Sequence, residues 1–336
     1  MGKKTATVNK TPGPLLTVDN ISKTFTTRKS SWFRKGDASA TKAVNSVSFE
    51  IRRGECLGLV GESGSGKTTV SKILMRAVRP DQGSVTFHRP QGDIDVLNAR
   101  DDDLKELRSK IQMVFQDPIS SLSPRMTVGN ILSEPLEIHG RGDAKYRSEK
   151  VRNLVRAIGL GESALNRYPH SFSGGQRQRI GIARALALGP ELLICDEPVS
   201  ALDVSVQAQI LNLLKDLQQD LGLTYLFISH NLAVVDYMAD RVAVMCEGRI
   251  VELAPREILM RAPVHPYTKS LLAAVPFPDL DRPLDFRTIG KISATGKFDW
   301  GKQFRDEGDG EMVSADLGEG HFVLANGNAD MRELRP

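Results

Sequence analysis

Four short apolar runs, each ending abruptly in a polar residue or a glycine, are the feature of this sequence that most constrains its fold. They read CLGLVG, IQMVFQ, LLICDE and TYLFISH. Continuous apolar runs of this length are typical of parallel strands that are covered on both faces. Helix-period segments, such as 68–78 and 205–222, lie between them. The alternation therefore predicts an α/β domain built on a mostly parallel sheet.

The polar endings of these runs predict a single site. Ligands of open parallel sheets bind beyond the carboxyl ends of the strands, so the endings are expected to converge there. The first ending opens the motif GESGSGKT, which stands after a strand and before a helix, as a phosphate-binding loop does. Its backbone N–H groups are expected to cradle phosphate oxygens. The residues predicted to bind nucleotide here are Gly61, Glu62, Ser63, Gly64, Ser65, Gly66, Lys67, Thr68 and Thr69.

The remaining endings supply the side chains that hydrolysis of the phosphoanhydride bond between the β- and γ-phosphates needs. Thr68 and Asp196 are predicted ligands of Mg²⁺, and Lys67 is expected to neutralise the β- and γ-phosphates. Glu197 is the predicted general base, although two adjacent carboxylates also suit the start of the next element. Gln116 and His230 are predicted to contact the γ-phosphate, a metal ligand or the attacking water, and Gln116 is also a predicted metal ligand; each alone reads as an ordinary loop residue.

A second anion-binding pattern, SGGQ, opens a helix at Ser173, Gly174, Gly175 and Gln176. A helix N-terminus that begins with two glycines offers N–H groups and a positive dipole end to a phosphate. A capping box between Ser173 and Gln176 is the local alternative, although it does not by itself require two glycines. Because the motif belongs to a separate helical segment, it is predicted to hold the nucleotide of a second subunit. Asp203 is expected to make contacts across the same interface.

The flanking segments differ in texture from the sheet domain. An antiparallel β subdomain is predicted from the alternating segments 15–25 and 40–55, which a basic loop, 27–40, separates. An inserted helical subdomain is predicted over about 117–188. The ATPase domain is predicted to span 15–275, preceded by a flexible tail, 1–14. The extension 276–336 is predicted to be partly flexible, and its acidic segment 306–319 to be flexible or loosely docked.

Composition excludes several function classes. No apolar stretch approaches the roughly 20 residues that span a bilayer, and the N-terminus lacks the apolar region of a secretory signal. The formal net charge of +4 is too small to predict nucleic-acid binding. Cys56, Cys195 and Cys246 show no metal-binding spacing and are expected to be buried and reduced, which fits a cytosolic compartment.

Taken in order, the phosphate loop, MVFQDP, SFSGGQRQR, LLICDEP, SALD and FISH resemble the nucleotide-binding subunits of ABC transporters over about residues 15–276. The resemblance implies that Phe25 stacks on adenine and that two ATP molecules are sandwiched between two such subunits. Further segments, including HPYTKSLLAAVP, resemble the oligopeptide and dipeptide importer family. This likeness implies a second ATPase subunit, identical or paralogous, two membrane permease subunits and an extracytoplasmic solute-binding protein. It also implies a location at the cytoplasmic face of the plasma membrane.

The same resemblance leaves the cargo open, since such importers also move sugars, opines, nickel or glutathione. Many of these relatives carry a C-terminal cysteine cluster, whereas no cysteine follows Cys246 here, so no iron–sulfur cluster is expected. Soluble ABC ATPases that act on DNA or ribosomes are the alternative from another class. The short interval between Lys67 and Ser173 has no room for their long coiled coils, and the chain has one cassette. A regulatory domain with degenerate chemistry is disfavoured by the intact Asp196, Glu197 and His230.

Overall fold

The computed structural model describes most of the chain. The described residues are 13–27, 39–117, 120–274, 300–306, 311–330, 332 and 334. The predicted tail, apart from residues 13 and 14, lies outside these ranges, as do most of the basic loop and much of the extension after residue 275.

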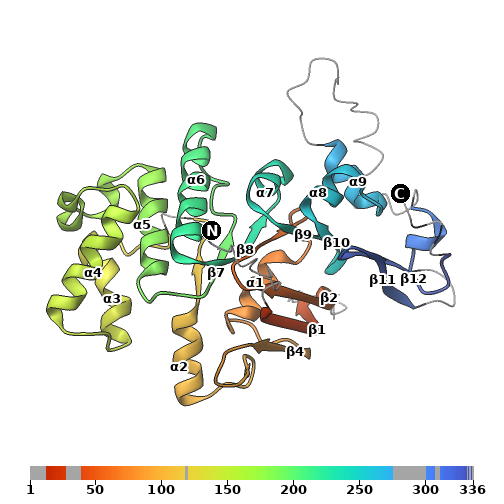
Figure 1. The fold of residues 1–336 in the computed structure, drawn as a ribbon, viewed down its shortest axis with the longest axis horizontal. Helices are drawn as coiled ribbons and strands as arrows, with labels where there is room; N and C mark the ends of the chain where they lie inside the picture. The colour runs from red at the N-terminus through yellow and green to blue at the C-terminus, as the bar shows by residue number, and fades with distance from the viewer. Residues whose placement is uncertain are drawn as a thin grey trace, which may run out of the picture.

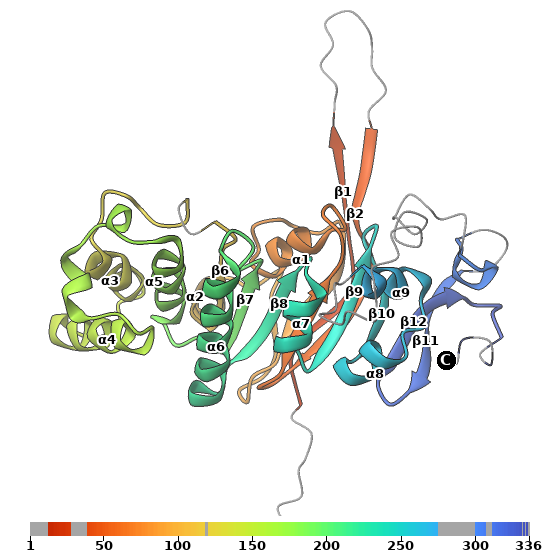
Figure 2. The same cartoon turned by 90° about the horizontal axis from the view of Figure 1, so that it is seen from above.

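An eight-stranded sheet forms the centre of the molecule, with the strand order β11-β12-β10-β9-β3-β8-β7-β6 (Figures 1 and 2). The five strands from β9 to β6 are parallel, and the others are antiparallel. The four predicted apolar runs are β3, β6, β7 and β8, which confirms the predicted fold class. The strands are β3 (Cys56–Val60), β6 (Ile111–Val114), β7 (Leu192–Asp196), β8 (Thr224–Ser229), β9 (Arg241–Cys246), β10 (Arg249–Pro255), β11 (Met312–Gly318) and β12 (His321–Asn326).

Both faces of the parallel strands are buried, which explains their apolar composition. In β7, Leu193 and Cys195 face one core cluster while Leu192 and Ile194 face the other. Strand β8 alternates in the same way, with Tyr225 and Phe227 on the first side. Successive side chains of a strand point to opposite faces, so every side chain is buried when both faces of the sheet are covered. Such strands are therefore apolar along their whole length. All three cysteines are buried in these clusters, as predicted.

A four-stranded antiparallel sheet, ordered β2-β1-β4-β5, covers one side of the core sheet. Its strands are β1 (Pro14–Thr27), β2 (Ser39–Arg52), β4 (Gln82–Phe87) and β5 (Ile94–Asp95). Strand β1 lies between β2 and β4 and pairs with both. The two alternating segments of the sequence are thus β1 and β2, which confirms the predicted antiparallel subdomain.

Helices cover the sheet and form a separate group at one end of the molecule. Between β6 and β7 the described residues contain helices and no strand, as the prediction for 117–188 required, and α3, α4 and α5 lie at the opposite end of the molecule from β11 and β12 (Figures 1 and 2). The α-helices are α1 (Lys67–Leu74), α2 (Asp101–Lys110), α3 (Val128–Ile138), α4 (Ala144–Ala157), α5 (Gly174–Leu186), α6 (Val204–Leu221), α7 (Leu232–Met238), α8 (Arg256–Arg261) and α9 (Pro266–Ala273). The 3-10 helices are η1 (Glu162–Asn166), η2 (Pro169–Ser171) and η4 (Lys302–Phe304).

The C-terminal residues correct one expectation. The sequence predicted a flexible or loosely docked segment over 306–319, whereas its second half forms β11, which pairs with β12. Strand β12 in turn pairs with β10, so this hairpin extends the core sheet. Ala315, Val323 and Ala325 are buried in a third apolar cluster, while Asp316 and Glu319 are exposed. These two acidic side chains therefore face solvent from a paired hairpin.

Among the described helices, none combines the length and the apolar character that crossing a membrane requires.

Candidate active site

The phosphate loop connects the carboxyl end of β3 to the first turn of α1. Its lysine is already held in place: the Lys67 Nζ donates to the carbonyl oxygens of Gly61 and Glu62, each at 2.7 Å. The side chain is buried, with 5% of the residue exposed. Burial lowers the pKa of the Lys67 ammonium, while the negative charges of Glu197 and Asp196 act in the opposite direction. The loop thus presents a charged amine inside a preformed turn.

Gly66 stands at the N-cap of α1 in a left-handed conformation, with φ at 107°. A Cβ placed there would lie 2.2 Å from the Ala43 carbonyl oxygen of β2, which is backbone and cannot rotate away. Gly64 is also left-handed, but a Cβ there would meet no heavy atom within 4 Å. A side chain at Gly64 would therefore cause backbone strain alone, whereas a side chain at Gly66 would cause both strain and steric overlap.

We expect Gly66→Ala to lower the free energy of unfolding by about 2 to 4 kcal/mol, since strain and overlap add. Gly64→Ala, as the matched control, should cost only about 1 to 2 kcal/mol, from strain alone. Urea unfolding of both variants measures the difference. Equal losses in the two variants would show that the Ala43 contact does not constrain the loop.

Asp196 lies at the end of β7, buried beside α1. The Ser71 Oγ donates to its Oδ2 at 3.3 Å, and the Thr68 Oγ lies 3.5 Å from its Oδ1. Burial raises the pKa of the Asp196 carboxyl, the Ser71 and Thr68 hydrogen bonds lower it, and the charge of Glu197 raises it further. Sequence reasoning missed Ser71, although its spacing of three from Thr68 places both hydroxyls on one face of α1.

Glu197 follows directly and brings two other strand endings together. The Gln116 Nε2 donates to its Oε2 at 3.0 Å, and the His230 Nδ1 lies 3.2 Å from its Oε1. Glu197 itself adopts a left-handed backbone conformation, with φ at 48°, and its N–H donates to the Ile228 carbonyl of β8 at 2.9 Å. A non-glycine residue in this region is strained by roughly 1 to 2 kcal/mol, and such strain is common at functional sites.

A cavity of about 540 Å³ lies between the phosphate loop and these strand ends. The predicted convergence of the strand endings on one site is therefore confirmed. Ala43 of β2 also lines the cavity, and the sequence offered no signal for it. The lining residues are Ala43, Glu62, Ser63, Gly64, Gly66, Lys67, Thr68, Thr69, Gln116, Glu197 and His230.

Phe25 is not among the residues that line this cavity. It lies near the end of β1, paired with Thr41 of β2, and 42% of it is exposed. The ammonium of Lys23 lies 5.7 Å from its ring centroid. Thr41 stands two residues before Ala43, so β2 connects Phe25 to the rim of the cavity. The stacking of Phe25 on adenine stays a prediction.

The SGGQ motif starts α5, and the described cavity lining does not include it. Ser173 and Gln176 form the capping box that the sequence allowed, with hydrogen bonds of 3.1 and 3.3 Å. Gly175 is buried, and a Cβ there would lie 2.3 Å from the Val206 Cγ1 of α6. Close packing of α5 on α6 therefore accounts for Gly175, a reason that the sequence argument did not consider. Gly174 is exposed.

Asp203 stands at the N-cap of α6 and is exposed. Its side chain makes no capping hydrogen bond to the described helix. The structure thus leaves its carboxylate at the surface, and its predicted role at an interface stays a prediction.

Known proteins are similar to this chain both in fold and in sequence. Residues 44–200 match the ABC transporter family, and residues 251–307 match the C-terminal region of oligopeptide/dipeptide transporters. The oligopeptide transport ATP-binding protein OppF of Bacillus subtilis is 49% identical over 285 residues, which are 84% of this chain and 90% of that protein. OppF of Streptococcus mutans is 45% identical over 315 residues, which cover 93% and 94%.

Solved structures agree. A dimeric ATP-binding cassette in a post-hydrolysis state, bound to ADP and phosphate, superposes with a TM-score of 0.60 at 29% identity, covering 72% of this chain and 98% of that one. The cbiO1 protein of Clostridium perfringens, part of an ABC transporter complex, gives 0.62 at 26% identity, covering 75% and 92%. The chain therefore belongs to the ABC transporter family, as an ABC-type ATPase of the oligopeptide/dipeptide transporter branch.

Proposed function

We propose that this chain is the ATP-hydrolysing subunit that powers the import of peptides or related small solutes through a membrane permease. One observation carries the proposal: the cavity gathers a complete phosphate loop and three polar strand ends, while the second anion-binding motif lies outside it. The printed names of the relatives, oligopeptide transport ATP-binding proteins, support the solute class. Related solutes remain within the proposal because no residue of this site touches cargo.

Within the cavity, each side chain has a role that its chemistry supports. The loop amides and Lys67 bind the phosphates, and Glu197 accepts the proton of the attacking water. Gln116 donates a hydrogen bond to one oxygen of Glu197 and the His230 Nδ1 contacts the other, so both side chains orient the carboxylate that lines the cavity. Because the hydrogen bonds hold the carboxylate before substrate arrives, little reorganisation is needed at the moment of reaction.

The oxygen donors near α1 fit Mg²⁺. Thr68, Gln116 and Asp196 bring a hydroxyl, an amide oxygen and a carboxylate, which are ligands that this hard cation prefers. The fit rests on Asp196: burial and the charge of Glu197 raise its carboxyl pKa, and its described hydrogen-bond partners are the neutral hydroxyls of Ser71 and Thr68. A divalent cation would compensate that buried charge and neutralise phosphate charge as the bond to the leaving group breaks.

The second half of the site is proposed to come from a second ATPase subunit, identical or paralogous. The N-terminus of α5 offers N–H groups and the positive end of the helix dipole, and Ser173 and Gly174 are exposed there. ATP bound between two subunits favours the closed dimer, and hydrolysis lets it reopen, because a ligand shifts an equilibrium by its difference in affinity. We propose that Asp203 lies at the same interface.

The remaining partners follow from the family. Two integral permease subunits are proposed to contact the helical subdomain at the cytoplasmic face of the plasma membrane, with a solute-binding protein acting on the other side. Closure of the dimer would move the segment near 116–135 against the permease. No nucleic-acid partner is proposed.

A shared site predicts that ATPase activity depends on concentration. We expect the specific activity of the purified chain to fall on dilution, and Ser173→Ala to lower it at least about 10-fold, since one hydroxyl and one helix end are lost from the site. Phosphate release measures both effects. Asp143→Ala is the matched control, because Asp143 caps α4 of the same subdomain through the Tyr146 N–H at 2.8 Å. Activity that is unaffected by dilution and by Ser173→Ala would contradict the shared site.

A further inference from the structure

A side chain from the C-terminal part of the chain, that of Tyr267, contacts the phosphate loop. Tyr267, in the first turn of α9, is 1% exposed. Its hydroxyl oxygen accepts a hydrogen bond at 3.0 Å from the backbone N–H of Glu62, which lies 205 residues earlier. Glu62 is the second residue of the phosphate loop and lines the nucleotide cavity. Tyr267 therefore holds one backbone amide of that loop by a hydrogen bond from the protein interior.

A series of buried hydrogen bonds holds Tyr267 in turn. The Tyr267 N–H donates to the Nδ1 of His265 at 3.1 Å. The backbone N–H groups of His265 and Val264 donate to the two carboxylate oxygens of Glu252 on β10, at 3.0 and 2.8 Å. The Nε2 of His321, on β12, lies 2.8 Å from the same carboxylate. A continuous hydrogen-bonded route thus runs from the C-terminal hairpin to the phosphate loop.

The members of this route are fixed by their surroundings. Glu252 is 1% exposed, His265 is fully buried, and His321 is 4% exposed. The rings of Trp300 and Phe304 pack edge-on against His265, with centroids 4.9 and 5.0 Å from it. Burial raises the pKa of the Glu252 carboxyl, but the hydrogen bonds from His321 and the two backbone amides outweigh it and lower the pKa.

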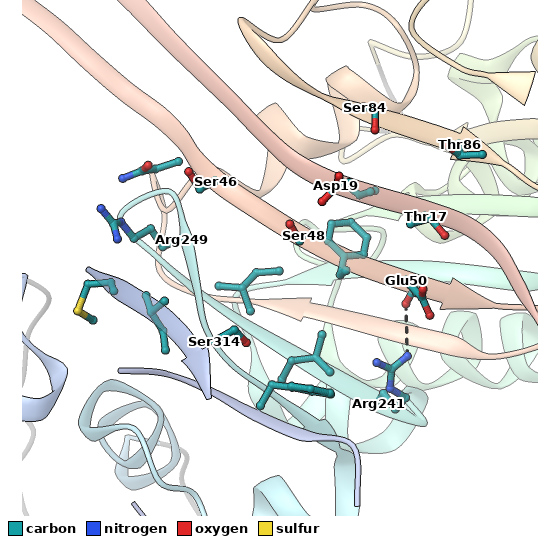
Figure 3. A pocket seen from close by; sticks show the side chains of 18 of the residues that line it. Thr17, Asp19, Ser46, Ser48, Glu50, Ser84, Thr86, Arg241, Arg249 and Ser314 are labelled. Atoms are coloured by element: carbon teal, nitrogen blue, oxygen red, sulfur yellow. Dashed lines mark hydrogen bonds between the residues drawn. The ribbon is translucent and has the colours of Figure 1, made fainter. Parts of the chain in front are cut away.

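The hairpin also packs against the nucleotide-binding part of the chain through Leu324 and Phe322, which lie against the two core clusters. Between it and the outer face of the antiparallel sheet lies a cavity of about 760 Å³, lined by Ser48, Arg249 and Ser314 among others (Figure 3). Besides these contacts, the hairpin is joined to the cassette by the pairing of β12 with β10 and by the Glu252–His321 pair. From that pair, hydrogen bonds lead through His265 and Tyr267 to the phosphate loop.

We propose that Tyr267 is a positioning residue for nucleotide binding, and that the Glu252–His321 pair lets the C-terminal hairpin hold it in place. The inference rests on the proposed ATP site. Tyr267 touches neither phosphate nor metal; it acts by keeping the Glu62 amide, and with it the start of the loop, in the geometry that receives phosphates. Losing one preorganising hydrogen bond weakens binding without removing a reacting group.

Tyr267→Phe removes the hydroxyl and keeps the ring. We expect the KM for ATP to rise about 5- to 10-fold, with kcat within about 2-fold of the wild type. Tyr225→Phe is the matched control, since Tyr225 is equally buried and its hydroxyl donates to the Leu214 carbonyl at 2.8 Å, in the core away from the cavity. Both variants should lower Tm similarly, but only Tyr267→Phe should change the KM.

Variants of His321 test the hydrogen-bonded route that runs from the C-terminal hairpin to Tyr267. We expect His321→Ala to raise the KM for ATP about 2- to 3-fold, and His321→Gln to restore most of the wild-type value, because a Gln Nε2 donates to Glu252 from a similar position. An unchanged KM in Tyr267→Phe, or an equal rise in Tyr225→Phe, would overturn the inference while leaving the ATPase intact. A wild-type chain that hydrolyses no ATP at any concentration, either alone or together with a paralogous ATPase subunit, would instead refute the proposed function.

Discussion

Replacing Glu197 by Gln is expected to slow ATP hydrolysis by about 10²- to 10⁴-fold, the range typical of losing a general base. The amide keeps the size of the side chain but cannot accept the proton of the attacking water. Nucleotide binding should survive, because Lys67 and the loop amides are untouched. The variant is therefore expected to accumulate as an ATP-bound dimer. Phosphate release measures the rate, and sedimentation with ATP measures the dimer.

Glu191→Gln is the control for this prediction. Glu191 precedes β7 at the end of the strand opposite Glu197, where its carboxylate pairs with Arg53 and Lys110, each at 2.7 Å. The substitution makes the same chemical change to a carboxylate outside the cavity, so hydrolysis should stay near the wild-type rate. Normal hydrolysis by the Glu197 variant would show that another group accepts the proton.

The second large effect concerns stability in acid. Burial lowers the pKa of His265 to about 4, against 6.5 for an exposed histidine; the charge of Glu252 raises it and that of Lys269 lowers it. Below pH 6.5 the unfolded chain binds a proton at this histidine that the folded chain does not bind until about pH 4. The free energy of unfolding therefore falls as the pH falls through this window. Between pH 7 and 4.5 we expect His265 to account for about 2 to 3 kcal/mol of the loss.

His265→Asn isolates this contribution. His265 is the N-cap of α9, and an Asn side chain accepts the same Tyr267 N–H without titrating. The variant loses ring contacts and is expected to be less stable at pH 7, but its stability should fall less steeply on acidification. Urea unfolding at a series of pH values gives the slopes. His170→Asn, at an exposed histidine, is the control. Equal slopes in wild type and His265→Asn would contradict the prediction.

The core sheet and most of the residues that line the nucleotide cavity could be predicted from the sequence. A parallel strand covered on both faces must be apolar along its whole length, so strands such as β7 are visible in local composition. Their polar endings, including Glu197 and His230, are visible for the same reason, and the carboxyl ends of parallel strands necessarily meet. Motif spacing then identified Lys67 and Thr68.

Contacts between distant parts of the chain required the structure. The acidic composition of 306–319 suggested a loose segment, yet pairing with β10 and a few buried residues such as Val323 are enough to order the hairpin. A binding role for Gly175 stays a prediction, but its packing against Val206 could not be predicted because it depends on how α5 meets α6. Ser71 and Ala43 join the site because of where α1 and β2 lie.

By itself the sequence determined β3, β6, β7 and β8, the phosphate loop and the polar endings, because burial and anion binding place local demands on residue type. Only the tertiary structure decided that the Tyr267 hydroxyl accepts a hydrogen bond from the Glu62 amide, and that hydrogen bonds link Glu252 and His321 to Tyr267. A hydrogen bond between residues so far apart leaves no periodicity or spacing to read, since it depends on the packing of α9 and β12 on the finished sheet.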